Sequence, residues 1–234
     1  MNEFLLIASI FVIFGGTVLF YKLFDEMGLY CFLVIATIAA NIEVLILVKA
    51  FGIEQTLGNV LFTSTFLVTD ILSELKGKAS AKKAVNVGIA STIAFIIISQ
   101  SWLLYIPSSN DFISPAMRAV FSNTPRMMIA GLVVYIIVQR FDVWSYNKLW
   151  SITEKKSGSK RRFLWLRNNV STLTSQLLNT ILFNLFAFYG TYNAKTLISI
   201  MVSGYIIFLI ASVADTPFLY WARRIRDKKE AKLS

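Results

Sequence analysis

The sequence contains no histidine, and Cys31 is the one cysteine among its 234 residues. The absence of histidine excludes zinc sites built on imidazole, Ser-His-Asp triads and histidine proton relays. A single cysteine excludes a disulfide bond within the chain. The sequence also lacks a Walker A motif, so we expect that this chain does not hydrolyse ATP. We therefore predict no cofactor and no metal site.

Charged residues are scarce as well, at 15% of the chain, whereas 56% of the residues are apolar or aromatic. Soluble domains average about 25% charged and about 45–50% apolar residues. The mean hydropathy is +0.64, and the apolar residues gather in runs such as 4–20 and 89–98. Because one helical crossing needs about 20 mostly apolar residues, these runs predict an integral membrane protein.

Seven apolar windows predict an all-α bundle of about seven transmembrane helices that forms a single domain over residues 1–234. The expected spans are residues 4–20, 28–50, 58–75, 84–106, 116–139, 164–189 and 196–221. We expect residues 144–162 to form a flexible basic loop. Pro217 is expected to break the last helix, because proline removes a backbone hydrogen bond. The connections are too short for a nucleic-acid-binding domain.

Basic residues set the expected orientation. Of the 23 Lys and Arg residues, nineteen lie in or beside alternate connections and in the C-terminal tail, and two lie in or beside the other connections, with Lys49 and Arg167 counted at the ends of their windows. The remaining two, Arg118 and Arg126, fall within the fifth window. Because cytoplasmic segments carry an excess of Lys and Arg, we predict an outside N-terminus and a cytoplasmic C-terminus. The net charge of +10 then reflects topology and contact with the lipid bilayer rather than nucleic-acid binding.

Polar residues within the expected spans are candidates for a binding site. An ionisable side chain at the middle of a membrane helix costs about 2.5–3.5 kcal/mol, so it usually faces a cavity or a partner. Asp70 and Glu74 are four residues apart and share one helix face. The alternative for this pair is an interfacial contact with Lys78 or Lys82. The candidates outside the sixth span are Asn41, Glu43, Asp70, Glu74, Arg126 and Asp215. For Arg126 the alternative is a structural salt bridge to Glu43 or to another buried carboxylate.

The sixth expected span contains a stripe of amides and hydroxyls. It starts at Asn168 and Asn169 and continues through Thr172, Ser175, Gln176 and Asn179, at spacings of three and four residues. Within a membrane such a stripe must face protein or water. It either joins helices or lines a site for an uncharged, planar ligand, because amides and hydroxyls offer both donors and acceptors.

Five segments carry a resemblance to a known family. They are residues 68–77 (VTDILSELKG), 123–126 (NTPR), Gln139 with Asp142 and Val143, 165–176 (WLRNNVSTLTSQ) and 215–220 (DTPFLY). From about Gly28 onward the chain resembles the bacterial queuosine precursor transporters of the vitamin uptake transporter family. The resemblance implies a six-helix family core plus an N-terminal helix, and it adds Gln139 to the candidate site. It also implies uptake of 7-deazaguanine bases (preQ0, preQ1) or queuine across the bacterial inner membrane for tRNA modification.

The chemistry of a 7-deazaguanine fits these candidates. One edge of the base presents ring N–H and amine donors beside a carbonyl acceptor. A carboxylate from Glu43, Asp70 or Glu74 would accept the donors, and an amide or Arg126 would serve the carbonyl.

The chain departs from the family pattern at three positions. Asn179 stands where we expect a carboxylate, Phe208 where relatives carry a lysine, and Glu43 where we expect glutamine. These differences predict a rearranged ligand pocket.

Other functions stay open at this point. The chain could be the substrate-binding component of an energy-coupling-factor importer for another small base or vitamin, with separate ATPase subunits. It could form a homodimer. An intramembrane aspartyl enzyme using Asp70 and Asp215 is less compatible with the sequence, because no GxGD-like motif frames either residue. A purely structural membrane protein would tolerate apolar replacement of the buried polar residues.

Overall fold

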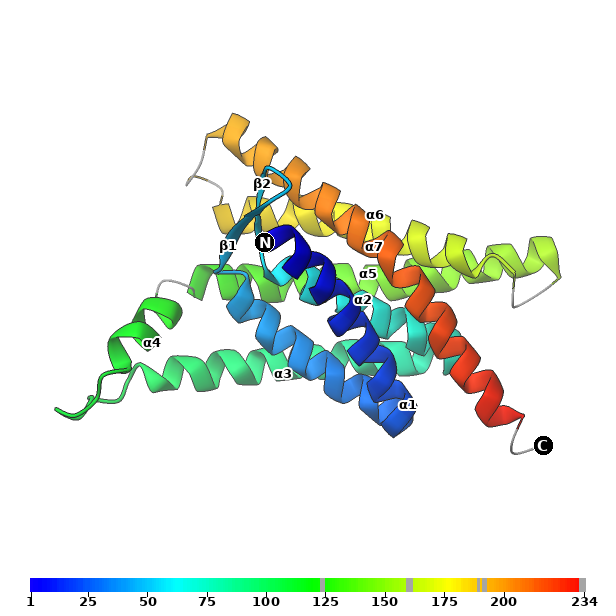
Figure 1. Ribbon diagram of the computed structural model, residues 1–234, viewed down its shortest axis with the longest axis horizontal. Helices are drawn as coiled ribbons and strands as arrows, with labels where there is room; N and C mark the ends of the chain where they lie inside the picture. Colours follow the sequence, from blue (N-terminus) through cyan, green and yellow to red (C-terminus); the bar gives the residue numbers. More distant parts are fainter. Residues whose placement is uncertain (123–124, 159–161, 189, 191–192, 232–234) are drawn as a thin grey trace.

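The computed structural model describes residues 1–122, 125–158, 162–188, 190 and 193–231. Long helices pack side by side in a bundle (Figure 1). The elements in chain order are α1 (Asn2–Glu43), β1 (Leu47–Ala50), β2 (Ile53–Thr56), α2 (Gly58–Leu75), α3 (Lys78–Trp102), α4 (Ser114–Phe121), α5 (Pro125–Ser157), α6 (Leu164–Phe188) and α7 (Ala194–Glu230).

Helix α1 consists of two helices that fold back on one another. Its helical dihedrals are interrupted at Asp25, where φ is 54° and ψ is −137°. The rings of Phe20 and Phe32 lie 5.5 Å apart across the reversal. Gly28 permits this approach, because a Cβ at that position would lie 2.1 Å from the Phe20 carbonyl oxygen. The two halves of α1 therefore correspond to the first two expected helices.

The second expected helix ends earlier than the apolar window. Helix α1 stops at Glu43, and residues 47–50 form a strand that pairs antiparallel with β2. Phe51 and Gly52 join the strands with φ of 53° and 75°. Positive φ at both central residues is the geometry that two-residue hairpins favour. The helical reading of residues 44–50 was therefore wrong, because the tight turn lets a continuous apolar run pair as strands.

The fifth window is divided between two helices. The short helix α4 ends at Phe121, and α5 begins at Pro125, a residue suited to the first helical position. Helix α5 then continues to Ser157, so most of the expected loop at residues 144–162 is helical. Helix α7 likewise continues through Pro217 to Glu230 without a break. One lost hydrogen bond does not end a helix of this length that packs against α1, α2 and α6.

Helix α2 lies at the centre of the bundle, in contact with α1, α3, α5 and α7. Its residues from Thr63 to Glu74 are all buried. Apolar side chains such as Phe11, Val12 and Ile97 are instead exposed on the outer surface, as lipid contact requires. Within the described residues, four helices are long and apolar enough to cross a membrane: α1, α3, residues 129–156 of α5 and residues 197–230 of α7. The chain is thus an α-helical membrane protein with several crossings.

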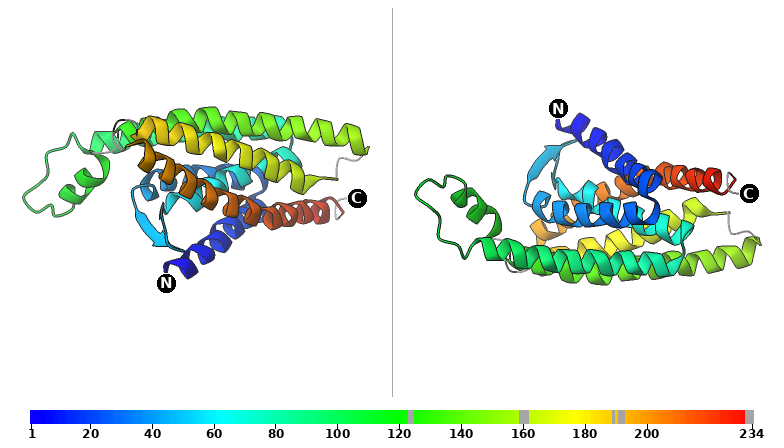
Figure 2. Two further views of the ribbon diagram at one scale, coloured as in Figure 1. Left: turned by 90° about the horizontal axis from the view of Figure 1, so that it is seen from above. Right: turned by 90° about the horizontal axis from the view of Figure 1, so that it is seen from below.

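The two ends of the bundle differ. Helix α4 lies at one end, and the C-terminal ends of α5 and α7 and the start of α6 lie at the other (Figure 2). The kink of α1 lies at this second end as well, because the Lys229 ammonium near the end of α7 lies 5.3 Å from the centre of the Tyr21 ring. Lys76, at the C-terminal end of α2, forms an ion pair of 3.2 Å with Asp25 in this kink. The connections that are rich in basic residues therefore meet at one end, as the charge pattern predicts.

Candidate functional site

Three carboxyl groups from three helices meet at α6 inside the bundle. Asp70 of α2, Asp142 of α5 and Asp215 of α7 have no exposed surface. Asp70 Oδ2 accepts a hydrogen bond of 3.0 Å from Thr172, and Asp215 Oδ1 accepts one of 2.7 Å from the Asn168 amide. The α6 partners of the three carboxyl groups, Asn168, Ser171, Thr172 and Ser175, lie within about two turns of that helix. We call these three residues the carboxylate cluster.

Asp142 and Ser171 are site residues that the sequence analysis missed. Asp142 Oδ1 accepts hydrogen bonds of 2.9 Å from both Ser171 and Ser175. The fifth apolar window ended at Gln139, three residues before Asp142, so Asp142 was placed in a connection. Gln139 and Asp142 are three residues apart, so they share a helix face if the helix continues past Gln139. This spacing is the sequence signal that could have identified Asp142.

The carboxylate cluster has no cationic partner among the described residues. No Lys or Arg there forms an ion pair with Asp70, Asp142 or Asp215, although Glu74 has two such partners. A buried carboxylate without a cation must bind a proton or accept hydrogen bonds from another donor. The cluster therefore suits a ligand that brings N–H donors or positive charge.

Several buried polar atoms around the cluster make no hydrogen bond within the described part of the chain. They are Asp70 Oδ1, Asp215 Oδ2, Asn168 Oδ1, Gln139 Oε1 and both side-chain amide atoms of Gln176. An unsatisfied buried polar group costs about 1–3 kcal/mol, so such groups are rare in stable cores. Their concentration at one place is typical of a binding site that a ligand completes.

Three further predicted residues flank the cluster on α5 and α6. Gln139 is fully buried and donates a hydrogen bond of 2.6 Å to Thr65 on α2. Asn169 is half-buried and donates one of 2.8 Å to Thr216 on α7. Asn179 is buried two turns beyond Thr172. The polar stripe of α6 therefore faces the interior of the bundle, as its spacing predicts.

Glu74 has a different environment one turn from Asp70. Its Oε2 atom accepts hydrogen bonds of 2.6 Å from Arg167 and 3.0 Å from Tyr146. Its Oε1 atom lies 3.7 Å from an Arg223 nitrogen. The alternative pairing with Lys78 or Lys82 was wrong, because these lysines begin α3 while the two arginines project from α6 and α7. Glu74 thus joins α2, α5, α6 and α7.

The remaining predicted residues lie elsewhere. Gly58 packs against the end of α1, where a Cβ would lie 3.0 Å from the Ala40 carbonyl oxygen. Asp70 follows twelve residues later on α2, about 18 Å along the axis. The structure therefore does not bring Asn41 and Glu43 to the cluster. Arg126 lies in the first turn of α5, not in the middle of one helix over residues 116–139, and its side chain falls outside the described residues.

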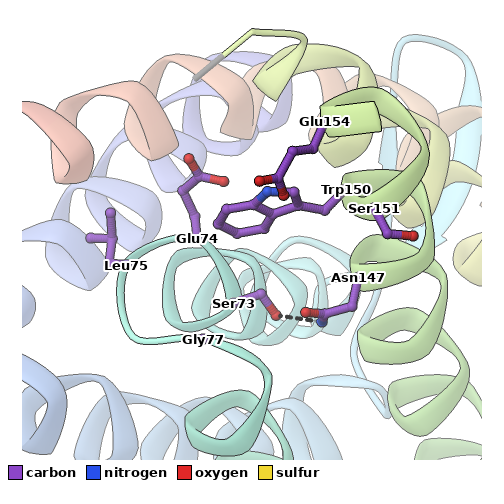
Figure 3. Close-up of a pocket in the computed structure, with 8 residues that line it drawn as sticks. All are labelled: Ser73, Glu74, Leu75, Gly77, Asn147, Trp150, Ser151 and Glu154. Carbon is purple, nitrogen blue, oxygen red and sulfur yellow. Dashed lines mark hydrogen bonds between the residues drawn. The ribbon is translucent and has the colours of Figure 1, made fainter. Parts of the chain in front are cut away.

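A shallow cavity of about 310 Å³ that is open to the surface lies beside Glu74, between the C-terminal end of α2 and α5 (Figure 3). Its polar lining includes Ser73, Glu74, Asn147 and Glu154, and Trp150 contributes its indole ring. The Arg167 guanidinium lies 4.6 Å from the centre of that ring. We call this cavity the inner pocket.

Comparison with known proteins identifies the family. The sequence model of a family described as "Putative vitamin uptake transporter" matches residues 56–222. Over 207 residues the chain is 37% identical to a "Probable queuosine precursor transporter" of Bacillus subtilis (strain 168), which covers 88% of each chain. No match was found among solved structures. The matched residues include the carboxylate cluster and the polar stripe of α6. This chain therefore belongs to the vitamin uptake transporter family, and it is a transporter rather than an enzyme.

Proposed function

We propose that this protein imports queuosine precursors across the cytoplasmic membrane of a bacterium, for the modification of tRNA. The substrates would be 7-deazaguanine bases such as preQ0 and preQ1, or queuine. The name of the Bacillus relative indicates this substrate class. The observation that carries the proposal is the carboxylate cluster, with no cationic partner in the described residues and with unpartnered amides beside it.

The cluster offers the groups that such a base needs. The free Oδ1 atom of Asp70 and Oδ2 atom of Asp215 would accept hydrogen bonds from the ring N–H and the exocyclic amine. Gln176 would donate to the base carbonyl with its unpartnered amide nitrogen. Thr172 and Asn168 hold the other oxygens of the two carboxylates in place. Binding would thus satisfy polar atoms that are costly to leave unpaired.

Transport would proceed by alternating exposure of this site to the two sides of the membrane. The carboxylate side chains have no exposed surface, so a base would reach them only after the surrounding helices move apart. By the distribution of basic residues, the N-terminus would lie outside and the C-terminus in the cytoplasm. Glu74 and its arginine partners would then close the cytoplasmic side of the site. Opening in that direction would require these ion pairs to separate.

Two sources of energy fit this arrangement. A carboxylate without a cation can carry a proton together with the base, which would couple uptake to the proton gradient. Alternatively, the chain would act as the substrate-binding component of an energy-coupling-factor importer for a small base or vitamin. Uptake that collapses with a protonophore in a host without partner ATPases would favour the first mechanism.

The test is uptake of radiolabelled preQ0, preQ1 and queuine in a bacterial host that lacks its own transporter. The native chain should accumulate at least one of them, and Asp70→Asn and Asp142→Asn should reduce the initial rate at least tenfold. Glu230→Gln, an exposed carboxylate on α7, serves as the control and should keep the native rate. Glu43→Gln should keep it too, because Glu43 lies far from Asp70. Unchanged uptake in Asp70→Asn at equal protein level would overturn the proposal.

A further inference from the structure

The inner pocket has a lining that the central site does not explain. It lies beyond Glu74, on the side away from Asp70, and exposed Ser151 and half-buried Glu154 place its mouth at the surface. Its volume of about 310 Å³ reaches the lower end of the range for small-molecule sites. The pocket is therefore large enough for a bicyclic base and is accessible from the end that carries the C-terminus.

The two carboxylates of the inner pocket differ in charge compensation. Glu74 is balanced by Arg167 and Arg223. Glu154 forms no side-chain hydrogen bond or ion pair within the described residues, and it lines the pocket together with Trp150 (Figure 3). Its carboxylate can therefore accept hydrogen bonds from a ligand in the pocket.

The other polar groups of the pocket are amides and hydroxyls that can form hydrogen bonds with a base. Asn147 donates a hydrogen bond of 2.7 Å to the Val143 carbonyl and approaches Ser73 Oγ at 3.4 Å. Its amide oxygen and the Ser151 hydroxyl lie on the same face of α5 as Glu154, and Ser73 of α2 adds a hydroxyl, so the lining provides both donors and acceptors. Aromatic side chains bind bases by stacking, since every base has a π-face. A carboxylate accepts paired N–H donors such as those of a guanine edge.

We propose that the inner pocket is a second binding site for the base, in which the base stacks on the face of the Trp150 ring opposite the Arg167 guanidinium and Glu154 accepts the N–H donors of the base. This proposal rests on the proposed function and deepens it. Glu74 lines the pocket and also closes the central site, so a base released past Glu74 would enter the pocket directly. The inner pocket would thus hold the base immediately before its release into the cytoplasm.

The test is equilibrium binding of radiolabelled preQ1 to the full chain in lipid nanodiscs. The native protein should bind two bases per chain, and Asp70→Asn should retain one. In the Asp70→Asn background, Glu154→Gln should weaken the remaining site by about tenfold to a hundredfold, because a bond to a charged acceptor is lost. Glu230→Gln in the same background should leave it unchanged.

Trp150 provides a second, independent readout. Trp150→Phe keeps an aromatic ring and should retain binding in the Asp70→Asn background, whereas Trp150→Ala should lose it. Trp144→Ala is the matched control, because Trp144 lies on the same helix with its ring exposed beside Lys148. This comparison separates stacking from a loss of folding.

The outcomes distinguish the two proposals. One base per chain that is lost in Asp70→Asn and unaffected by Glu154→Gln would overturn the second site and leave the transport proposal intact. No binding of preQ1 by the native chain, together with no uptake of any precursor, would overturn both. Two sites with the stated pattern of losses would support both.

Discussion

Removal of the Arg167 guanidinium should destabilise this protein more than any loss of a surface charge. The Glu74–Arg167 pair is 2.6 Å long, and its side chains are 3% and 0% exposed. Arg167→Met leaves a buried Glu74 with Tyr146 and with Arg223 at 3.7 Å. Breaking a buried pair from one side typically costs about 3–5 kcal/mol, because the buried charge that stays behind loses its nearest opposite charge.

The matched control is an ion pair of similar length at the surface. Lys76 lies 3.2 Å from Asp25, with side chains that are 30% and 46% exposed. Lys76→Met should therefore cost no more than about 1 kcal/mol. Thermal unfolding of the purified protein in detergent would measure both variants. At roughly 2–4 °C per kcal/mol for a chain of this size, Tm should fall by about 6–20 °C for Arg167→Met and by less than about 4 °C for Lys76→Met.

A double-mutant cycle separates the ion pair from the other contacts of Arg167, which donates to the Arg162 carbonyl and lies over the Trp150 ring. Glu74→Gln combined with Arg167→Met should be less destabilising than the sum of the two single changes, by about 0.5–3 kcal/mol. Strict additivity, or equal shifts for Arg167→Met and Lys76→Met, would refute the assignment of Glu74 and Arg167 as a coupled buried pair.

Three further predictions concern the α1 reversal, the carboxylate cluster and helix α4. Gly28→Ala should lower Tm by several degrees, because its Cβ would lie 2.1 Å from a carbonyl oxygen, whereas Gly204→Ala, which meets nothing within 4 Å, should be neutral or stabilising. The double change Ser171→Ala and Ser175→Ala removes both hydrogen-bond donors to Asp142 Oδ1 and should reduce the rate of preQ1 uptake about tenfold or more. The control is Ser101→Ala, which breaks a hydrogen bond only to Ile98 of its own helix and should not change the rate. Equal uptake by the double variant and the control would count against a role for Asp142. Hydrogen bonds from the Ser114 hydroxyl and from the backbone N–H groups of Ser114 and Ile113 lower the pKa of Asp111 below its ordinary value. This contact therefore stabilises the start of α4 above about pH 3.9 and is lost as pH falls through the lowered pKa; NMR titration should show this for the native chain, and an ordinary Asp111 pKa would contradict it.

The membrane class and much of the central site follow from local sequence patterns. Apolar run length determines how many residues stay in lipid, and the bounds of α2 match the third window at residues 58–75. The spacing of Asn168, Thr172 and Gln176 places them on one face of α6 whatever its neighbours are. That face had to be inward because lipid does not accept hydrogen bonds. The prediction of buried amides on α6 therefore needed no tertiary information.

Helix ends were less predictable than helix faces. Residues 44–50 are apolar enough for a span but leave the helix and form strand β1 at 47–50, and residues 140–157 are polar enough for a loop but extend α5. Hydropathy measures preference for lipid, whereas a helix can continue into water and a turn can end one inside an apolar run. Asp142 was missed for this reason alone.

The sequence by itself determined that this is a membrane protein of the vitamin uptake transporter family with polar groups in its interior. Only the tertiary structure decided which of those groups meet. Glu74 and Arg167 are separated by 93 residues, and Asp70 and Thr172 by 102. Such pairings depend on how each helix is rotated and shifted against its neighbours. The periodicity of residues along one helix carries no information about that rotation and shift. The packing around α2 therefore gives the Glu74 carboxylate arginine partners, whereas the Asp70 carboxylate, only one helical turn away, has no ion pair within the described residues.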